Sequence, residues 1–180
     1  MLVIHGLLGI GKTTIAKAIF NLIAYRFERS SFLEDVRENS KTNDGVLQLQ
    51  RALYYEILGA RNLKVHGISK IMEKLHHKKI LLILDDVDKL VQVENLLGKC
   101  NWFASGSRII ITTREKKLLS TLQEDCHLFY YKVKELDERE SRELFFQHAF
   151  KRNKPAEDHS EIVHQFIGYA KGLSFKNSRC

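Results

Sequence analysis

Two runs of consecutive apolar residues constrain the fold of this chain most strongly. Residues 80–84 (I-L-L-I-L) form one run, and residues 109–111 (I-I-I), within the segment 107–112, form the other. Neither run alternates with polar residues, so each is expected to form a strand that is buried on both faces. Such strands occur in parallel sheets with helices on both sides. The sequence therefore predicts an α/β fold with a parallel sheet flanked by helices.

The segments around these runs fit the same architecture. Residues 12–27 carry apolar side chains at helical spacing and follow a short apolar segment at 2–5. Asp137 and Glu140 have the spacing of a capping box and predict a helix that ends at Phe150. The other expected strands are 31–36 and 127–133, the other expected helices are 47–58, 68–76, 90–97 and one from about 158 to a stop at Gly172, and 37–45 is expected to be a loop.

The composition excludes several classes of protein. The 180 residues are 44% hydrophobic and 28% charged, which is typical of a globular chain rather than a disordered one. No apolar stretch approaches the roughly 20 residues of a membrane span, and we expect no signal peptide. Cys100, Cys126 and Cys180 are widely spaced and form no zinc pattern. We expect reduced thiols and a cytoplasmic location.

The formal net charge of +7 raises the question of nucleic-acid binding. The basic residues are spread along the chain, and the densest group is Lys70, Lys74, Lys78 and Lys79 beside His76 and His77. Lysines at that spacing are typical of the solvated face of a helix. Because no nucleic-acid-binding motif accompanies them, we expect no specific nucleic-acid partner.

A glycine-rich segment connects the first expected strand to the first expected helix. Residues 6–14 read G-L-L-G-I-G-K-T-T and fit the phosphate-binding pattern G-x-x-x-x-G-K-[ST]. Glycines let successive backbone N–H groups face one phosphate, and the helix N-terminus adds partial positive charge. Lys12 would reach the β-phosphate, and the γ-phosphate when present, while Thr13 would ligate Mg²⁺. The strand and helix on either side disfavour a glycine turn without a ligand.

Two carboxylates follow the apolar run 80–84. Asp85 would hold Mg²⁺, directly or through water. Asp86 could orient or deprotonate an attacking water, or it could cap the following helix, and the spacing does not separate these roles. Arg114 follows the other apolar run. If that strand lies beside the first strand, Arg114 would approach the γ-phosphate, although a surface arginine fits the spacing equally well.

The ordered set of motifs resembles the NB-ARC nucleotide-binding domain of plant disease-resistance proteins with leucine-rich repeats. The matching segments are G-L-L-G-I-G-K-T-T (6–14), F-L-E-D-V-R-E (32–38), K-K-I-L-L-I-L-D-D-V-D (78–88), W-F-A-S-G-S-R-I-I-I-T-T-R (102–114), Y-K-V-K-E-L-D (131–137) and A-K-G-L (170–173). They run in order through nearly all of 2–173. Asp88 at the end of the D-D-V-D run resembles the TIR-type branch, since the other branch usually has Trp there.

The resemblance implies a P-loop NTPase fold and a switch that rests with ADP, exchanges it for ATP, and then self-associates in immune signalling. It implies TIR and leucine-rich-repeat domains elsewhere in the parent chain. It also implies roles for single residues. Asp86 would be the hydrolytic acid and Arg114 the sensor arginine, and the strand ending at Thr113 would lie between the other two. The implied nucleotide- and magnesium-binding residues are Gly6, Gly9, Ile10, Gly11, Lys12, Thr13, Thr14, Asp85 and Arg114, with Thr13 and Asp85 on the metal.

Some positions depart from the family pattern. Leu8 stands where Gly is usual, and Ser174-Phe175 stand where Pro-Leu would continue the match. The short segment before Gly6 would leave out residues that help to hold adenine. We expect a nucleotide-binding core at 1–135, the start of a helical ARC subdomain at 136–173 and a disordered tail at 174–180. Two alternatives are a truncated fragment that binds no nucleotide and a phosphotransferase, although no segment suggests the acceptor pocket that transfer would need.

Overall fold

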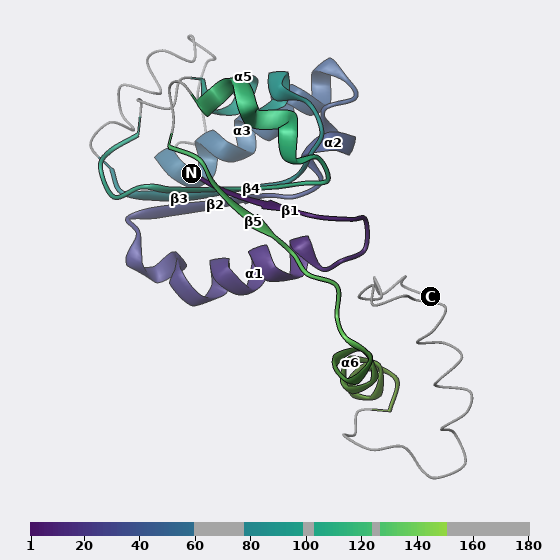
Figure 1. Cartoon of the computed structure of the whole chain (residues 1–180). Coiled ribbons are helices and arrows are strands. Elements are labelled where there is room, and N and C mark those ends of the chain that lie inside the picture. The colour runs from purple at the N-terminus through teal and green to yellow at the C-terminus, as the bar shows by residue number, and fades with distance from the viewer. Residues whose placement is uncertain (60–77, 99–102, 124–126, 151–180) are drawn as a thin grey trace. The chain divides into compact units, whose positions relative to one another are not determined.

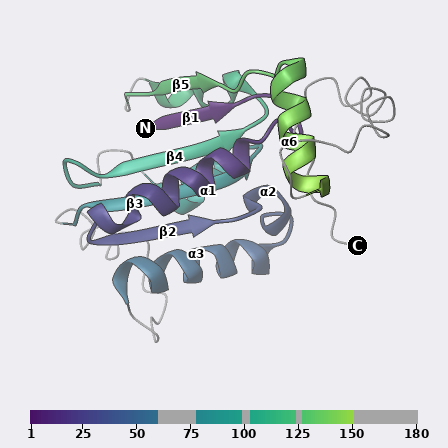
Figure 2. The same ribbon diagram turned by 90° about the horizontal axis from the view of Figure 1, so that it is seen from below.

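The computed structural model describes residues 1–59, 78–98, 103–123 and 127–150 (Figure 1). These residues contain a five-stranded parallel sheet with the strand order β2-β3-β4-β1-β5, which Figure 2 shows from one face. The strands are β1 Leu2–His5, β2 Arg29–Leu33, β3 Ile80–Val87, β4 Arg108–Thr113 and β5 Phe129–Lys132. The helices are α1 Lys12–Ile23, η1 Ala24–Arg26, α2 Val36–Asn39, α3 Asn43–Leu58, α5 Leu90–Leu97, η3 Lys116–Gln123 and α6 Glu138–Phe150.

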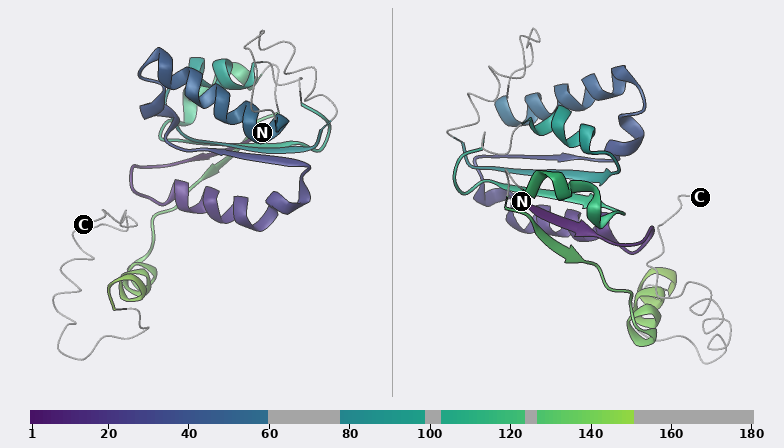
Figure 3. Two further views of the ribbon diagram at one scale, coloured as in Figure 1. Left: turned by 180° about the vertical axis from the view of Figure 1, so that it is seen from behind. Right: turned by 45° about the horizontal axis from the view of Figure 1, so that its top comes forward.

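The chain divides into two compact units. The first consists of Met1–Gly6 and Lys12–Lys132 and contains the whole sheet. The second consists of Leu7–Gly11 and Val133–Cys180, of which 7–11 and 133–150 are described. Within the first unit, α1 covers one face of the sheet, and α3 and α5 cover the other (Figure 3). This layered parallel sheet confirms the α/β prediction.

Strand β3 is the centre of the hydrophobic core. The side chains of residues 80–84 are all 0% exposed, as the unbroken apolar run predicts for a strand covered on both faces. Strand β4 lies between β3 and β1, with Leu82 opposite Ile109 and Leu2 opposite Ile110. The predicted place of the strand that ends at Thr113 is therefore confirmed. Because all the strands are parallel, their carboxyl ends meet at one edge of the sheet.

The prediction of a loop at 37–45 is wrong. Residues Val36–Asn39 form α2, and α3 begins at Asn43. The Thr42 hydroxyl accepts a hydrogen bond from the Gly45 N–H at 3.1 Å and caps α3, which is the role that favours threonine at this position. Helix α2 is one turn long and buries only Val36, so its sequence carries no helical periodicity to detect.

Other boundaries shift by a few residues. Strand β2 covers Arg29–Leu33 rather than 31–36, and β3 continues to Val87. Helix α5 covers Leu90–Leu97 as predicted. The capping box before α6 is confirmed, since Asp137 N–H donates to Glu140 Oε2 at 2.9 Å and Glu140 N–H donates to Asp137 Oδ1 at 2.7 Å.

Several predictions lie outside the described residues. These are the helices at 68–76 and from 158 to 172, and the disordered tail at 174–180. Within the described part of the chain, no helix is long and apolar enough to cross a membrane.

Gly45 offers a test of the α2–α3 packing. A Cβ atom at this position would collide with the backbone carbonyl oxygen of Asn39. Gly45→Ala should therefore destabilise the protein by about 1–3 kcal/mol, although the same change inside an unhindered helix stabilises by about 1 kcal/mol. Gln48→Ala, on the exposed part of the same helix, should change stability by less than about 0.5 kcal/mol. Urea unfolding measures both changes, and a more stable Gly45→Ala variant would contradict the packing.

Candidate functional site

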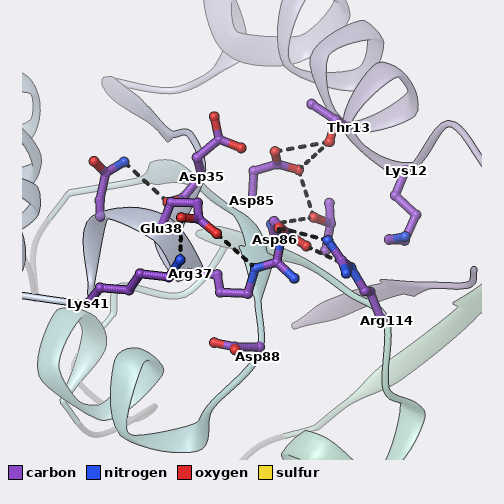
Figure 4. Close-up of polar contacts among 12 residues, drawn as sticks. Lys12, Thr13, Asp35, Arg37, Glu38, Lys41, Asp85, Asp86, Asp88 and Arg114 are labelled. Atoms are coloured by element: carbon purple, nitrogen blue, oxygen red, sulfur yellow. Dashed lines mark hydrogen bonds and ion pairs between the residues drawn. The ribbon is translucent and has the colours of Figure 1, made fainter. Parts of the chain in front are cut away.

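The candidate site lies where the carboxyl ends of β1, β3 and β4 meet (Figure 4). Open parallel sheets bind ligands at this edge, because the loops that leave the strands there bring polar groups together. Gly6 follows β1, Asp85 and Asp86 lie in the last part of β3, and Arg114 follows β4. Each of these residues belongs to the first compact unit.

The glycine-rich loop between β1 and α1 needs glycine at two positions. Gly9 has a φ of 78° and Gly11 a φ of 99°, in the left-handed region that L side chains rarely adopt. Between them, Ile10 N–H closes a turn by donating to Leu7 O at 3.4 Å. Gly9 and Gly11, the second and third glycines of the G-x-x-G-x-G segment, thus stand on either side of Ile10 in backbone conformations that glycine adopts without strain. Residues 7–11 belong to the second compact unit.

Lys12 is the first residue of α1, and it is buried, with 7% of its surface exposed. Its Nζ donates a hydrogen bond to the Gly6 carbonyl oxygen at 2.9 Å. This bond holds the ammonium at the N-terminal end of the helix, where the unpaired backbone N–H groups carry partial positive charge. Thr14, in the same turn, is exposed. A buried lysine at a helix N-terminus is a strong attractor for a phosphate group.

Asp85 is a buried carboxylate surrounded by hydroxyl groups. It is 2% exposed. Thr13 Oγ1 donates to its two oxygens at 2.9 and 3.0 Å, and Thr112 Oγ1 donates to Oδ1 at 2.7 Å. Burial raises the pKa of Asp85 above its ordinary value, and nearby Asp35 and Asp86 act in the same direction, while the two hydroxyl hydrogen bonds partly oppose the rise.

The environment of Asp85 fits a magnesium ion. In the described part of the chain no lysine or arginine pairs with this carboxylate, so its charge has only hydroxyl partners. A carboxylate and a threonine hydroxyl are oxygen donors of the kind that Mg²⁺ takes from proteins. The described residues contain no group of three or more His, Cys, Asp or Glu that would hold a metal without other ligands. Asp85 and Thr13 therefore fit an ion that takes its remaining ligands from phosphate and water.

A bulge in β3 separates the two acids. Leu84 pairs with Ile111 and Val87 with Thr113, so three steps along β3 oppose two steps along β4. Asp86, inside this irregularity, has a φ of 56°, which is unusual for a residue other than glycine. Its N–H donates to Thr112 Oγ1 at 2.8 Å, while the same hydroxyl donates to Asp85. Bulges of this kind redirect side chains beside functional sites.

Asp86 forms ion pairs with two arginines. Its Oδ2 lies 2.9 Å from a terminal nitrogen of Arg37, and its Oδ1 lies 3.4 Å from Nε of Arg114. Asp86 does not cap the following helix. That role belongs to Gln92, whose Oε1 accepts hydrogen bonds from the N–H groups of Asp88 and Lys89 at 3.0 and 3.1 Å.

The structure thus brings Lys12, Thr13, Asp85, Asp86 and Arg114 to one edge of the sheet. Sequence reasoning missed Arg37 and Thr112. Arg37 lay in the segment expected to be a loop, and its position in F-L-E-D-V-R-E is the only signal for it. Thr112 could have been found, because a polar residue at the end of a doubly buried strand needs a polar partner.

Comparison with known proteins gives three findings. A family profile described as "NB-ARC domain" matches residues 1–155. The chain is 43% identical to the disease resistance protein RUN1 of Vitis rotundifolia over 178 residues, which is 96% of this chain and 13% of that protein. It is 40% identical to the TMV resistance protein N of Nicotiana glutinosa over 180 residues, which is 94% of this chain and 15% of that protein. The chain thus spans only a small part of the length of these relatives.

A solved structure is similar in fold. AMPPCP-bound DnaA from Aquifex aeolicus superposes with a TM-score of 0.57 at 15% sequence identity, over 96% of this chain and 51% of that chain. With the parallel sheet and the glycine-rich loop, this likeness shows a P-loop NTPase fold.

Asp85 predicts a pH-dependent stability difference in the absence of divalent cations. Its pKa is raised in the folded state, so ionisation costs stability above the folded pKa and costs nothing below the unfolded pKa. In EDTA, Asp85→Asn should be more stable than the parent chain at pH 7. This advantage should shrink as the pH falls through the folded pKa towards the unfolded value of about 3.9.

Thermal unfolding at several pH values measures this difference, and Asp44→Asn, at an exposed position in α3, is the control. An Asp85→Asn variant that is less stable at pH 7, or a difference that does not change with pH, would contradict the assignment of burial as the dominant cause.

Proposed function

Because the chain belongs to the NB-ARC family, we propose that it is the ADP- and ATP-binding switch module of a plant immune receptor. The family and the fold support nucleotide binding. The observation that carries the proposal is the meeting of Lys12, Thr13, Asp85 and Arg114 at one edge of the sheet. The segment that precedes Lys12 in the chain is glycine-rich and has two left-handed glycines. These are the groups that a nucleoside di- or triphosphate with Mg²⁺ requires.

Each residue has a separate task in this proposal. Lys12 neutralises the β-phosphate, and the backbone N–H groups of residues 9–14 donate to phosphate oxygens, as Gly9, Ile10, Gly11 and Thr14 do in the motif that they match. Thr13 and Asp85 hold Mg²⁺, which offsets phosphate charge when it is bound. The hydrogen bond from Lys12 Nζ to Gly6 O holds the ammonium at the end of β1 before nucleotide arrives.

Hydrolysis in this proposal is slow and acts as a timer. The oxygen of a water molecule forms a bond to the γ-phosphorus, the bond from that phosphorus to the bridging oxygen breaks, and ADP leaves. Asp86 accepts the proton of the water. Both oxygens of Asp86 face arginines, so an ion pair must loosen before the carboxylate reaches a water. Arg114 offsets the charge on the terminal phosphate.

The other domains of the receptor complete the proposal. TIR and leucine-rich-repeat regions, self-association after exchange of ADP for ATP, and a cytoplasmic location come from the resemblance to TIR-type resistance proteins. The small share of RUN1 and of the N protein that this chain covers leaves room for such regions in a parent chain. Neither a nucleic acid nor a membrane is among the proposed partners.

Lys12→Ala should weaken ADP·Mg²⁺ binding by at least about 100-fold, because the phosphates lose their buried cation. Lys17→Ala is the matched control, since Lys17 lies on the same helix, is about half exposed and pairs with Glu34 at the surface. Isothermal titration calorimetry measures both affinities. Equal ADP affinity in the Lys12→Ala variant and the parent chain would reject the site. A chain that binds no ADP and unfolds cooperatively would favour the fragment alternative.

Asp86→Ala should lower the rate of ATP hydrolysis by about 100-fold or more, which is the usual contribution of a positioned general base. The affinity of the Asp86→Ala variant for ADP should stay within about threefold of that of the parent chain, which is a difference in binding free energy of less than roughly 0.7 kcal/mol. Asp88→Ala, two residues further along the chain and hydrogen-bonded to Gln92, should leave the rate unchanged. Release of inorganic phosphate measures the rate, and an unchanged rate in Asp86→Ala would leave Asp86 only a partner of the two arginines.

A further inference from the structure

Arg37 is a charged side chain at the site that the proposed function does not use. It projects from α2, which follows β2, and it approaches Asp86 in the neighbouring strand β3. Figure 4 shows the guanidinium groups of Arg37 and Arg114 both directed at the Asp86 carboxylate. All three side chains are largely buried, with 26% of Arg37, 34% of Arg114 and 17% of Asp86 exposed.

The two arginines hold Asp86 unequally. A terminal nitrogen of Arg37 lies 2.9 Å from Oδ2, which is the length of a strong charge-assisted hydrogen bond. Arg114 lies 3.4 Å from Oδ1 through Nε and 3.5 Å from Oδ2 through a terminal nitrogen, which is at the limit of hydrogen bonding. Arg37 is therefore the main partner of Asp86, and Arg114 is held loosely.

In this arrangement Arg114 still has an N–H group that can donate a hydrogen bond. Its Nε is buried and has no hydrogen-bond acceptor among the described residues, as is also true of Arg37 Nε, so the two arginines differ in their distances to Asp86 and not in this respect. A buried guanidinium nitrogen without an acceptor is costly, so the site is prepared for a further anion. A terminal phosphate offers the oxygen acceptors that a guanidinium fits best.

The charges around Arg37 also indicate that Arg37 is the main partner of Asp86 and that Arg114 is held loosely. Glu38, the other carboxylate near Arg37, is bound by Lys41 at 2.7 Å and is 3.7 Å from Arg37 Nε. The hydrogen bond from Lys41 is the main cause that lowers the pKa of Glu38. With Glu38 held by Lys41, two guanidinium groups face the single carboxylate of Asp86. Among Arg37, Arg114 and Asp86, one positive charge is therefore not neutralised. It lies on Arg114, the more weakly bound arginine.

We propose that Arg37 is a positioning residue that holds Asp86 and so leaves Arg114 available to the terminal phosphate, which sets the preference of the site for ATP over ADP. Without Arg37, Asp86 would draw both of its oxygens to Arg114, and the two charges would cancel. The γ-phosphate, which ADP lacks, would then lose its arginine. This inference rests on the proposed nucleotide-binding function.

The test compares two affinities in the 180-residue chain. Calorimetry with Mg²⁺ measures the dissociation constants of ADP and of β,γ-methylene-ATP, which is not hydrolysed. Arg37→Gln should weaken the binding of β,γ-methylene-ATP by about tenfold, which is the value of roughly one charge-assisted hydrogen bond. The affinity for ADP should change by less than about twofold. Lys17→Gln removes a half-exposed cation that pairs with Glu34 and should leave the ratio of the two affinities unchanged.

A second substitution separates positioning from a general loss of structure. Asp86→Asn removes the charge that would capture Arg114. Arg37→Gln combined with Asp86→Asn should therefore recover the ratio of the Asp86→Asn single variant. A fold defect caused by the loss of Arg37 would not be repaired by a change at Asp86.

The possible results are distinct. An unchanged ratio in Arg37→Gln, an equal fall in Lys17→Gln, or a fall that Asp86→Asn does not repair would overturn the inference while ADP binding by the parent chain still supports the proposed function. A folded parent chain that binds neither nucleotide would overturn both.

Discussion

Strand β4 pairs in parallel with β1 on one side and with β3 on the other, and the position of each site residue follows from this pairing. The ladder brings the end of β1, which leads into Gly6 and Lys12, within one strand of Asp85 and Asp86. It also places Thr112 between them, where its hydroxyl donates to Asp85 and accepts from the N–H of Asp86. A shift of one residue in the register of β4 would turn Thr112 to the other face and remove both bonds.

Burial at this edge makes electrostatics the main determinant of what the site can hold. Asp85 is ionisable and 2% exposed, and burial raises its pKa although hydrogen bonds from two hydroxyl groups partly oppose the rise. A divalent cation would reverse the cost of ionising it. Asp86, next in the chain, has the opposite surroundings, since two guanidinium groups face it. The two adjacent carboxylates therefore have different surroundings. The surroundings of Asp85 suit a cation, whereas Asp86 binds two arginines.

The sequence predicted what depends on local patterns. Residues 80–84 predicted a doubly buried strand because every side chain is apolar. Residues 6–14 predicted the phosphate loop because that motif requires glycine and lysine at fixed positions. It did not predict α2, which is a single turn with one buried residue, or the bulge at Asp85 and Asp86. Arg37 was missed for the same reason, since its role depends on β2 lying beside β3, and no local periodicity carries that information. Strand order requires long-range contacts, and only the family resemblance suggested part of it.

The account depends most on the claim that this edge binds a nucleotide through phosphate and magnesium. The most direct measurement is a calorimetric titration of the 180-residue chain with ADP, once with Mg²⁺ and once in EDTA. The account predicts saturable binding of one ADP per chain that is tighter with Mg²⁺, because Thr13 and Asp85 then share the ion with the phosphates. A chain that unfolds cooperatively and yet gives no saturable heat with ADP in either buffer would contradict it.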